Sequence, residues 1–212
     1  MTPGAPATPA ATTAPAAATP IGAQRAFYRT DPQCVLVQPD PGSEQTAAGT
    51  ALEAALARQL SSRFNRVIGA GEQRRVARTL ALDPASATDM RRTARRSGCP
   101  AILYWSLTAD EHDKTPLWSR REISVTASLR RSDDDVELWR GQHAVRRASG
   151  DPPLSLFSLP LAAYKAAKFD RSPELAASMA DDLARGLFVS LPDLRQLGPT
   201  SLARRNSGSA RK

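Results

Sequence analysis

Short apolar runs alternate along the chain with segments in which apolar residues recur every three to four positions. Residues 34–37 form one such run, Cys-Val-Leu-Val, which lies between prolines and is typical of a buried strand. The helical stripe in residues 44–62 predicts an amphipathic helix that Ser43 could cap. Residues 66–68 then predict a second, weaker strand.

Two short helices are expected next, near residues 72–81 and over residues 87–97. Ser86 and Asp89 resemble a capping box at the start of the second helix, and Gly98 is placed to end it in the left-handed conformation. Residues 101–107, Ala-Ile-Leu-Tyr-Trp-Ser-Leu, are the strongest apolar run and predict a central strand.

The second half of the chain has the period of an antiparallel hairpin. Residues 122–131 alternate between apolar and polar side chains, residues 133–135 supply an aspartate turn, and residues 136–147 return. A last helix is expected from Pro173 to about residue 190. The predicted fold is therefore a single, three-layer-like α/β domain. Its mixed sheet has a parallel β-α-β first half, an antiparallel hairpin second half and a closing C-terminal helix.

The two cysteines test this topology. Crossover connections are right-handed, so the strand at residues 34–37 should lie between those at 66–68 and 101–107. Cys34 and Cys99 would then meet at the same edge, with Cα atoms within about 8 Å of each other. If the protein is exported, a disulfide and a pair of free thiols are equally expected; in a reducing compartment two buried free thiols are expected.

Composition divides the chain into three parts. Residues 1–32 are expected to be a disordered Ala/Pro/Thr-rich tether, residues 33–192 the α/β domain and residues 193–212 a basic disordered tail. The net charge of +8 is divided as +1, +3 and +4 over these parts. No apolar run is long enough to span a bilayer, and the first 20 residues lack the pattern of a signal peptide or a lipobox.

Candidate chemistry is sparse, and we expect no enzyme, no catalytic residue, no metal site and no cofactor. The only histidines, His112 and His143, are interpreted as surface or packing residues, and neither is expected within hydrogen-bonding distance of a nucleophile. The turn at Gly69 and Gly71 lacks the further residues of a dinucleotide or phosphate loop. Residues 133–135 are interpreted as a solvated turn.

Two features suggest contact surfaces. The helix at residues 87–97 carries Arg91, Arg92, Arg95 and Arg96, which could face phosphates or a protein partner. Trp139 follows Leu138 in a strand, so strict alternation places it on the opposite sheet face, where residues 150–170 or a partner would cover it.

Four stretches of the chain together resemble a known family. They are CVLVQPD, ALEAALARQLSSRF, ARRSGCPAILYWSL and DDDVELWRG, which are similar to the periplasmic lipoproteins of the curli-secretion-channel type. That group includes PelC-like and LpoB-like lipoproteins and the N-terminal domain of TolB. Cys99 and Pro100 stand where Ala-Asp is usual, and the lipidated cysteine is missing.

The resemblance implies a non-catalytic accessory or assembly protein of the cell envelope. Its partners would be other envelope proteins or further copies of itself. It would work in the periplasm, associated with the outer membrane only through a tether that this chain does not show. The alternative is a cytoplasmic nucleic-acid-binding or regulatory module that uses the arginine-rich helix and the basic tail.

Overall fold

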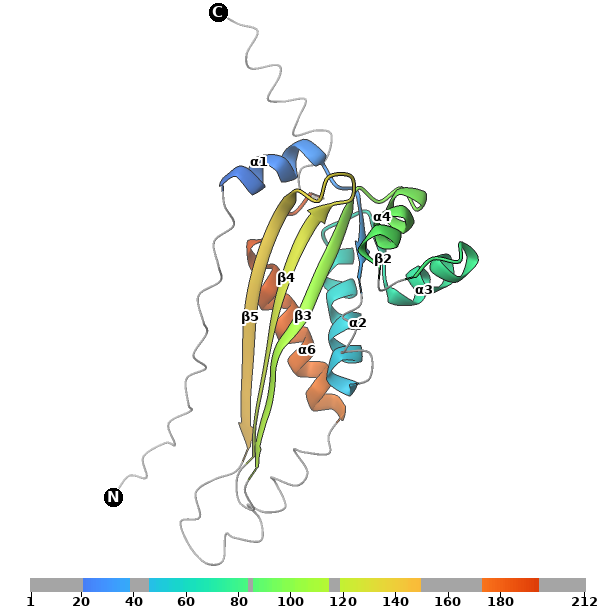
Figure 1. Ribbon diagram of the computed structural model, residues 1–212. Coiled ribbons are helices and arrows are strands. Elements are labelled where there is room, and N and C mark those ends of the chain that lie inside the picture. The colour runs from blue at the N-terminus through green and yellow to red at the C-terminus, as the bar shows by residue number, and fades with distance from the viewer. Residues whose placement is uncertain (1–20, 39–45, 84–85, 115–118, 150–172, 195–212) are drawn as a thin grey trace, which may run out of the picture.

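A five-stranded mixed sheet forms the centre of the computed structural model, which describes residues 21–38, 46–83, 86–114, 119–149 and 173–194 (Figure 1). The strand order is β2-β1-β3-β4-β5. The strands are β1 (Cys34–Val37), β2 (Arg66–Ile68), β3 (Ala101–Lys114), β4 (Ser119–Arg131) and β5 (Glu137–Ser149). The helices are α1 (Ile21–Thr30), α2 (Ala47–Ser61), α3 (Ala70–Thr79), α4 (Ala87–Arg96), α6 (Pro173–Leu187) and the short 3-10 helix η3 (Phe188–Ser190).

Strand pairing confirms the predicted fold class. β1 is parallel to both β2 and β3, while β3, β4 and β5 form an antiparallel meander. The β-α-β first half, the hairpin and the closing helix α6 all occur where the periodicity placed them.

Local capping explains where the helices begin and end. Thr46 caps α2 by accepting a hydrogen bond from the Gly49 backbone N–H at 3.0 Å, while Ser43 lies outside the described residues. Ser86 caps α4 in the same way, accepting from the Asp89 N–H at 3.4 Å. Gly98 then ends this segment with a φ of 69°, in the left-handed region that favours glycine.

Helices cover the sheet on both faces, which makes the domain three-layered. The larger core lies between one sheet face and helices α2 and α6, and includes Leu56, Leu103 and Leu183. A smaller cluster lies on the opposite face, where Leu36 and Ile102 meet Met90 of α4. In Figure 1, α2 and α6 lie behind β3–β5, whereas α3 and α4 lie beside β2.

The N-terminal boundary of the domain differs from the prediction. Residues 21–30, which the composition assigned to a disordered tether over 1–32, form the helix α1. Phe27 is fully buried in the larger core and packs edge-on against Phe64, with ring centroids 6.4 Å apart. This aromatic contact therefore anchors to the core a segment that was expected to belong to the tether.

At the other end the domain also reaches slightly further. Leu194 packs against the larger core, so residues 193–194 are not part of a disordered tail. Residues 1–20, 150–172 and 195–212 lie outside the described residues, and the predictions made for them stay predictions.

Candidate functional site

Small polar side chains cover one side of the antiparallel meander. Because side chains alternate along a strand, the residues between the core positions of β3, β4 and β5 all point away from α2 and α6. We call this surface the polar face; it consists of Tyr104, Ser106, Thr108, Ser124, Thr126, Ser128, Arg140 and Gln142. Among the described helices only α4 reaches it, where Tyr104 packs against the smaller cluster, and the polar face points towards the viewer in Figure 1.

Hydroxyl groups on the polar face are hydrogen-bonded across the strands. Ser106 Oγ lies 3.1 Å from Thr126 Oγ1, and Thr108 Oγ1 lies 2.8 Å from Ser124 Oγ. Each hydroxyl can both donate and accept, so the row keeps further capacity to bind a partner.

A shallow hollow of about 440 Å³ lies at the end of the polar face nearest α4. It is lined by Tyr104, Ser106, Thr126, Ser128, Arg140 and Gln142 together with adjoining backbone. Arg140 is held by a 2.6 Å ion pair to Glu137. The hollow therefore offers hydroxyls, an amide, a guanidinium and one aromatic ring to a ligand or partner.

Tyr104 stays a neutral phenol in this setting. Burial raises the pKa of its hydroxyl, the nearby Asp135 raises it further, and Arg91 and Arg130 partly oppose both. The Arg130 guanidinium lies 5.8 Å from the ring centroid, at cation–π distance. The ring is therefore available for stacking, not for use as a phenolate.

His112 departs from the expectation that neither histidine meets a nucleophile. Its Nε2 lies 3.1 Å from Ser119 Oγ, within hydrogen-bonding distance. His112 belongs to β3, and its pairing with β4 brings the two residues close. Ser119 is fully buried, however, and a buried hydroxyl cannot attack a substrate that approaches from solvent.

His143 is a packing residue, as expected. It lies on the α6 side of β5, directly against Gly186 of that helix. Burial lowers the pKa of its imidazole.

Trp139 is not on the opposite sheet face, and this prediction was wrong. A β-bulge shifts the register between Leu129 and Arg130, so Leu138 is an extra residue of β5 and both Leu138 and Trp139 enter the core. The indole packs against Phe188 at a centroid distance of 5.5 Å and donates a hydrogen bond to Ser190 Oγ at 3.1 Å. A side chain that is 1% exposed has no surface left for a partner. Among the described residues η3 packs over the indole, while residues 150–170 lie outside them.

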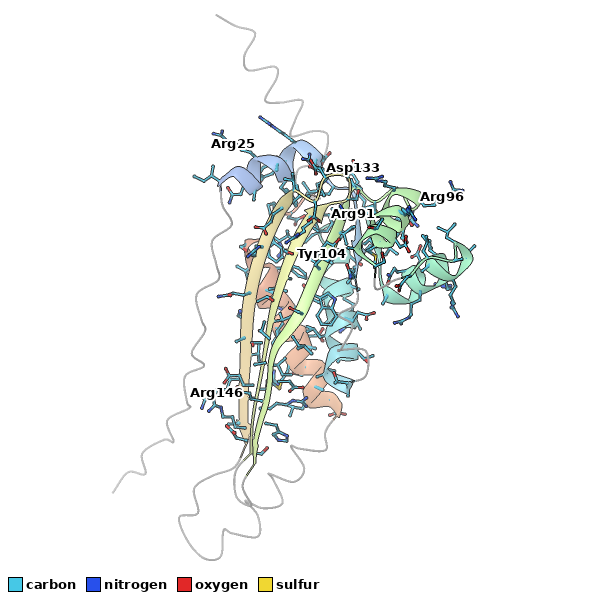
Figure 2. All side chains as sticks on the ribbon, viewed as in Figure 1. Arg25, Arg91, Arg96, Tyr104, Asp133 and Arg146 are labelled. Atoms are coloured by element: carbon cyan, nitrogen blue, oxygen red, sulfur yellow. A yellow bond between two sulfur atoms is a disulfide. The ribbon has the colours of Figure 1, made fainter. Side chains whose placement is uncertain are left out.

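The arginines of α4 are partly engaged within the domain. Arg92 pairs with Asp89 at 3.1 Å and Arg95 with Asp133 at 3.3 Å. Arg91 lies towards Tyr104, and Arg96 is exposed (Figure 2). Their use as an interface stays a prediction.

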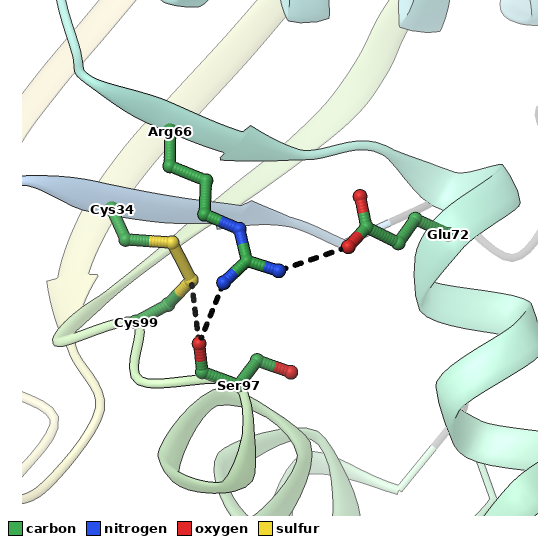
Figure 3. The surroundings of a disulfide bond; sticks show 5 residues. All are labelled: Cys34, Arg66, Glu72, Ser97 and Cys99. Carbon is green, nitrogen blue, oxygen red and sulfur yellow. Dashed lines mark hydrogen bonds and ion pairs between the residues drawn. A yellow bond between two sulfur atoms is a disulfide. The ribbon is translucent and has the colours of Figure 1, made fainter.

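The cysteines are joined in the structure by a disulfide, with the Cα atoms of Cys34 and Cys99 4.6 Å apart (Figure 3). The Ser97 carbonyl beside it accepts a hydrogen bond from Arg66 Nη1 at 3.3 Å, and Arg66 Nη2 pairs with Glu72 at 3.0 Å. The bond ties the loop after α4 to the start of β1.

Across the described ranges no group of three His, Cys, Asp or Glu residues is arranged to hold a metal ion. No helix in those ranges is both long and apolar enough to cross a membrane.

The polar face was not identified from the sequence. The alternation of Ser124, Thr126 and Ser128 predicted which way these side chains point, but not that Tyr104 and Gln142 would join them. That grouping depends on strand register.

Comparison with known proteins identifies the fold. No protein-family model matches the chain, and no curated protein matches it significantly. Among solved structures, a PelC dodecamer from Paraburkholderia phytofirmans matches over 86% of this chain and 98% of its own, with 15% identity and a TM-score of 0.51.

Two further structures match with lower TM-scores. Lipoprotein GNA1162 from Neisseria meningitidis matches over 66% of this chain and 100% of its own, with 21% identity and a TM-score of 0.47. The C-terminal domain of LpoB from Escherichia coli matches over 53% and 82%, with 21% identity and a TM-score of 0.38. The chain is thus similar in fold to PelC, one of the proteins that its motifs resemble; the likeness does not assign it to one member.

Proposed function

We propose that this protein is a non-catalytic accessory or assembly protein of the cell envelope, which works in the periplasm and binds other proteins. The observation that carries the proposal is the fold match to the PelC dodecamer over most of both chains. Because a shared fold supports a function only by analogy, the proposal also draws on two features of this chain.

The first feature is the disulfide between Cys34 and Cys99. Structural disulfides form and persist in oxidising compartments and are rare in a reducing cytosol. A bonded pair is therefore the state we expect in the periplasm.

The second feature is the polar face. Tyr and Arg are enriched where proteins bind one another. Tyr104 and Arg140 flank the hollow in this way, with Ser128 between them in the cross-strand row.

Cell fractionation combined with thiol trapping tests the compartment. The full chain, expressed from its own locus with a C-terminal tag, should be found with the envelope, and its cysteines should resist a maleimide until reductant is added. Recovery in the cytosol with both thiols reactive would contradict the proposal.

Photo-cross-linking tests the binding surface. A photoreactive residue at Gln142, on the polar face, should give adducts with envelope proteins. The same residue at Arg75, exposed on α3 away from that face, is the matched control. Equal adducts from both positions would remove the polar face from the proposal.

A further inference from the structure

The large apolar side chains that stay exposed are gathered at one end of the domain. Among the described residues they are Ile21, Tyr28, Val136 and Val189, with exposed fractions of 74%, 54%, 37% and 73%. Ile21 and Tyr28 belong to α1, Val136 leads from the hairpin turn into β5, and Val189 lies in η3. In the part of the chain that is described, no other large apolar side chain is as exposed as these four.

These three segments are neighbours in space. α1 packs beside β5 and over Phe64, and η3 is tied to the start of β5 by the hydrogen bond from Trp139 to Ser190. Figure 1 shows α1 across the end of the sheet where the β4–β5 turn lies. We call this end of the domain, defined by α1, η3 and Val136, the α1 end.

The outer face of α1 mixes apolar and basic residues. Ala23 and Phe27 face the core, so helical geometry places Ile21, Arg25 and Tyr28 together on the opposite face, with Arg29 beside them. Figure 2 shows Arg25 on this helix at the edge of the molecule. Such a face is typical of a helix that lies in a membrane interface, where apolar side chains insert and arginines reach lipid phosphates.

The positive charge of this face is not neutralised within the domain. No carboxylate among the described residues pairs with Arg25 or Arg29. By contrast, the aspartates of the nearby turn are each paired with an arginine, as Arg95–Asp133, Arg131–Asp134 and Arg130–Asp135.

The remaining sequence adds charge of the same sign. The described chain ends at Leu194, which packs on the core just after η3, and residues 195–212 contain five basic and no acidic residues. Basic residues of this kind attract an anionic bilayer surface. Residues 1–20, which precede Ile21, contain no Asp, Glu, Lys or Arg, so they add no negative charge that would repel an anionic surface.

We propose that the α1 end rests on an anionic lipid surface, with Ile21, Tyr28 and Val189 in the interface and Arg25 and Arg29 at the headgroup phosphates. This inference rests on the proposed envelope function and adds to it a direct membrane contact. It goes beyond the expectation that the membrane is reached only through a tether.

Vesicle co-sedimentation of the full chain tests the contact. The protein should bind phosphatidylcholine vesicles that contain phosphatidylglycerol and not vesicles of phosphatidylcholine alone. A basic residue near an anionic surface contributes on the order of five-fold in affinity, so Arg25→Gln with Arg29→Gln should weaken binding by about 25-fold. Ile21→Ser with Tyr28→Ser should also weaken it, because apolar insertion is lost.

The matched control is Arg75→Gln with Arg146→Gln, which removes the same charge from exposed positions on α3 and on the far half of β5. It should weaken binding by less than about three-fold, since salt screens charges that lie more than roughly 10 Å from the surface. An equal loss in this control, or equal binding to both kinds of vesicle, would overturn the inference.

A nucleic-acid partner predicts a different pattern. Vesicle binding that duplex DNA competes away and that does not depend on Ile21 and Tyr28 would also overturn the inference, because charge alone would then explain it. Failure here with the protein in the envelope rejects only the membrane contact. Recovery from the cytosol with free thiols rejects the proposed function, whatever the vesicles show.

Discussion

Gly186 of α6 lies directly against the imidazole of His143 on β5, in the space that a Cβ atom would occupy. Gly186 is inside the helix, where alanine would ordinarily be favoured by up to about 1 kcal/mol. The close approach opposes that preference, because a methyl group there would force either the imidazole or α6 to shift. The absence of a side chain at Gly186 therefore lets α6 pack closely against β5.

We predict that Gly186→Ala lowers the free energy of unfolding by about 1–3 kcal/mol, the usual cost of overpacking. Urea denaturation followed by circular dichroism measures the change. Gly71→Ala, within α3, is the control, because no atom lies within 4 Å of a Cβ built there. It should be neutral or slightly stabilising, and a similar loss in both variants would show that the contact with His143 is not the cause.

The disulfide should contribute substantially to stability. It closes a sequence separation of 65 residues, for which the chain-entropy model gives about 4 kcal/mol at 25 °C. Cys34→Ala with Cys99→Ala should lower the free energy of unfolding by about 2–5 kcal/mol. Dithiothreitol should destabilise the unmodified protein and leave the double variant unchanged; equal sensitivity in both would mean that the bond is not formed.

Acid should destabilise the fold in part through His143. Burial lowers the pKa of its imidazole below the ordinary value of 6.5, so below that pH the unfolded chain binds the proton more tightly than the folded one. Stability is therefore lost as the pH falls below 6.5 towards the folded pKa, and it is retained above 6.5. His143→Gln should flatten this part of a melting-temperature profile against pH.

Ser119 should not behave as a catalytic nucleophile, although it lies beside His112. Its complete burial predicts no reaction with a fluorophosphonate probe, as judged by mass spectrometry of the intact chain. Ser119→Ala serves as the background. Labelling of the unmodified chain that is lost in this variant would contradict the non-catalytic function.

Local periodicity was sufficient for most of the elements. The alternation in residues 122–131, the helical stripe of α2 and the turn at Gly98 depend on neighbours within a few positions, and each occurs where it was predicted. The parallel neighbours β1 and β3 also followed from the sequence, because crossover handedness leaves few arrangements.

Tertiary structure alone decided the features that depend on distant partners. α1 is held in place because Phe27 packs against Phe64 in the core. Trp139 is buried because a bulge in β5 interrupts the alternation of side chains. Likewise, Ser119 meets His112, Gln142 joins the polar face and Gly186 meets His143 only through strand register and helix packing. The amino-acid pattern by itself determined which segments are helix or strand and which side chains prefer burial, since these are local and solvation effects. Which surfaces meet was decided by the packed fold. Most of these contacts join residues far apart in sequence, and even Ser119 and His112, seven positions apart, meet only because β3 pairs with β4.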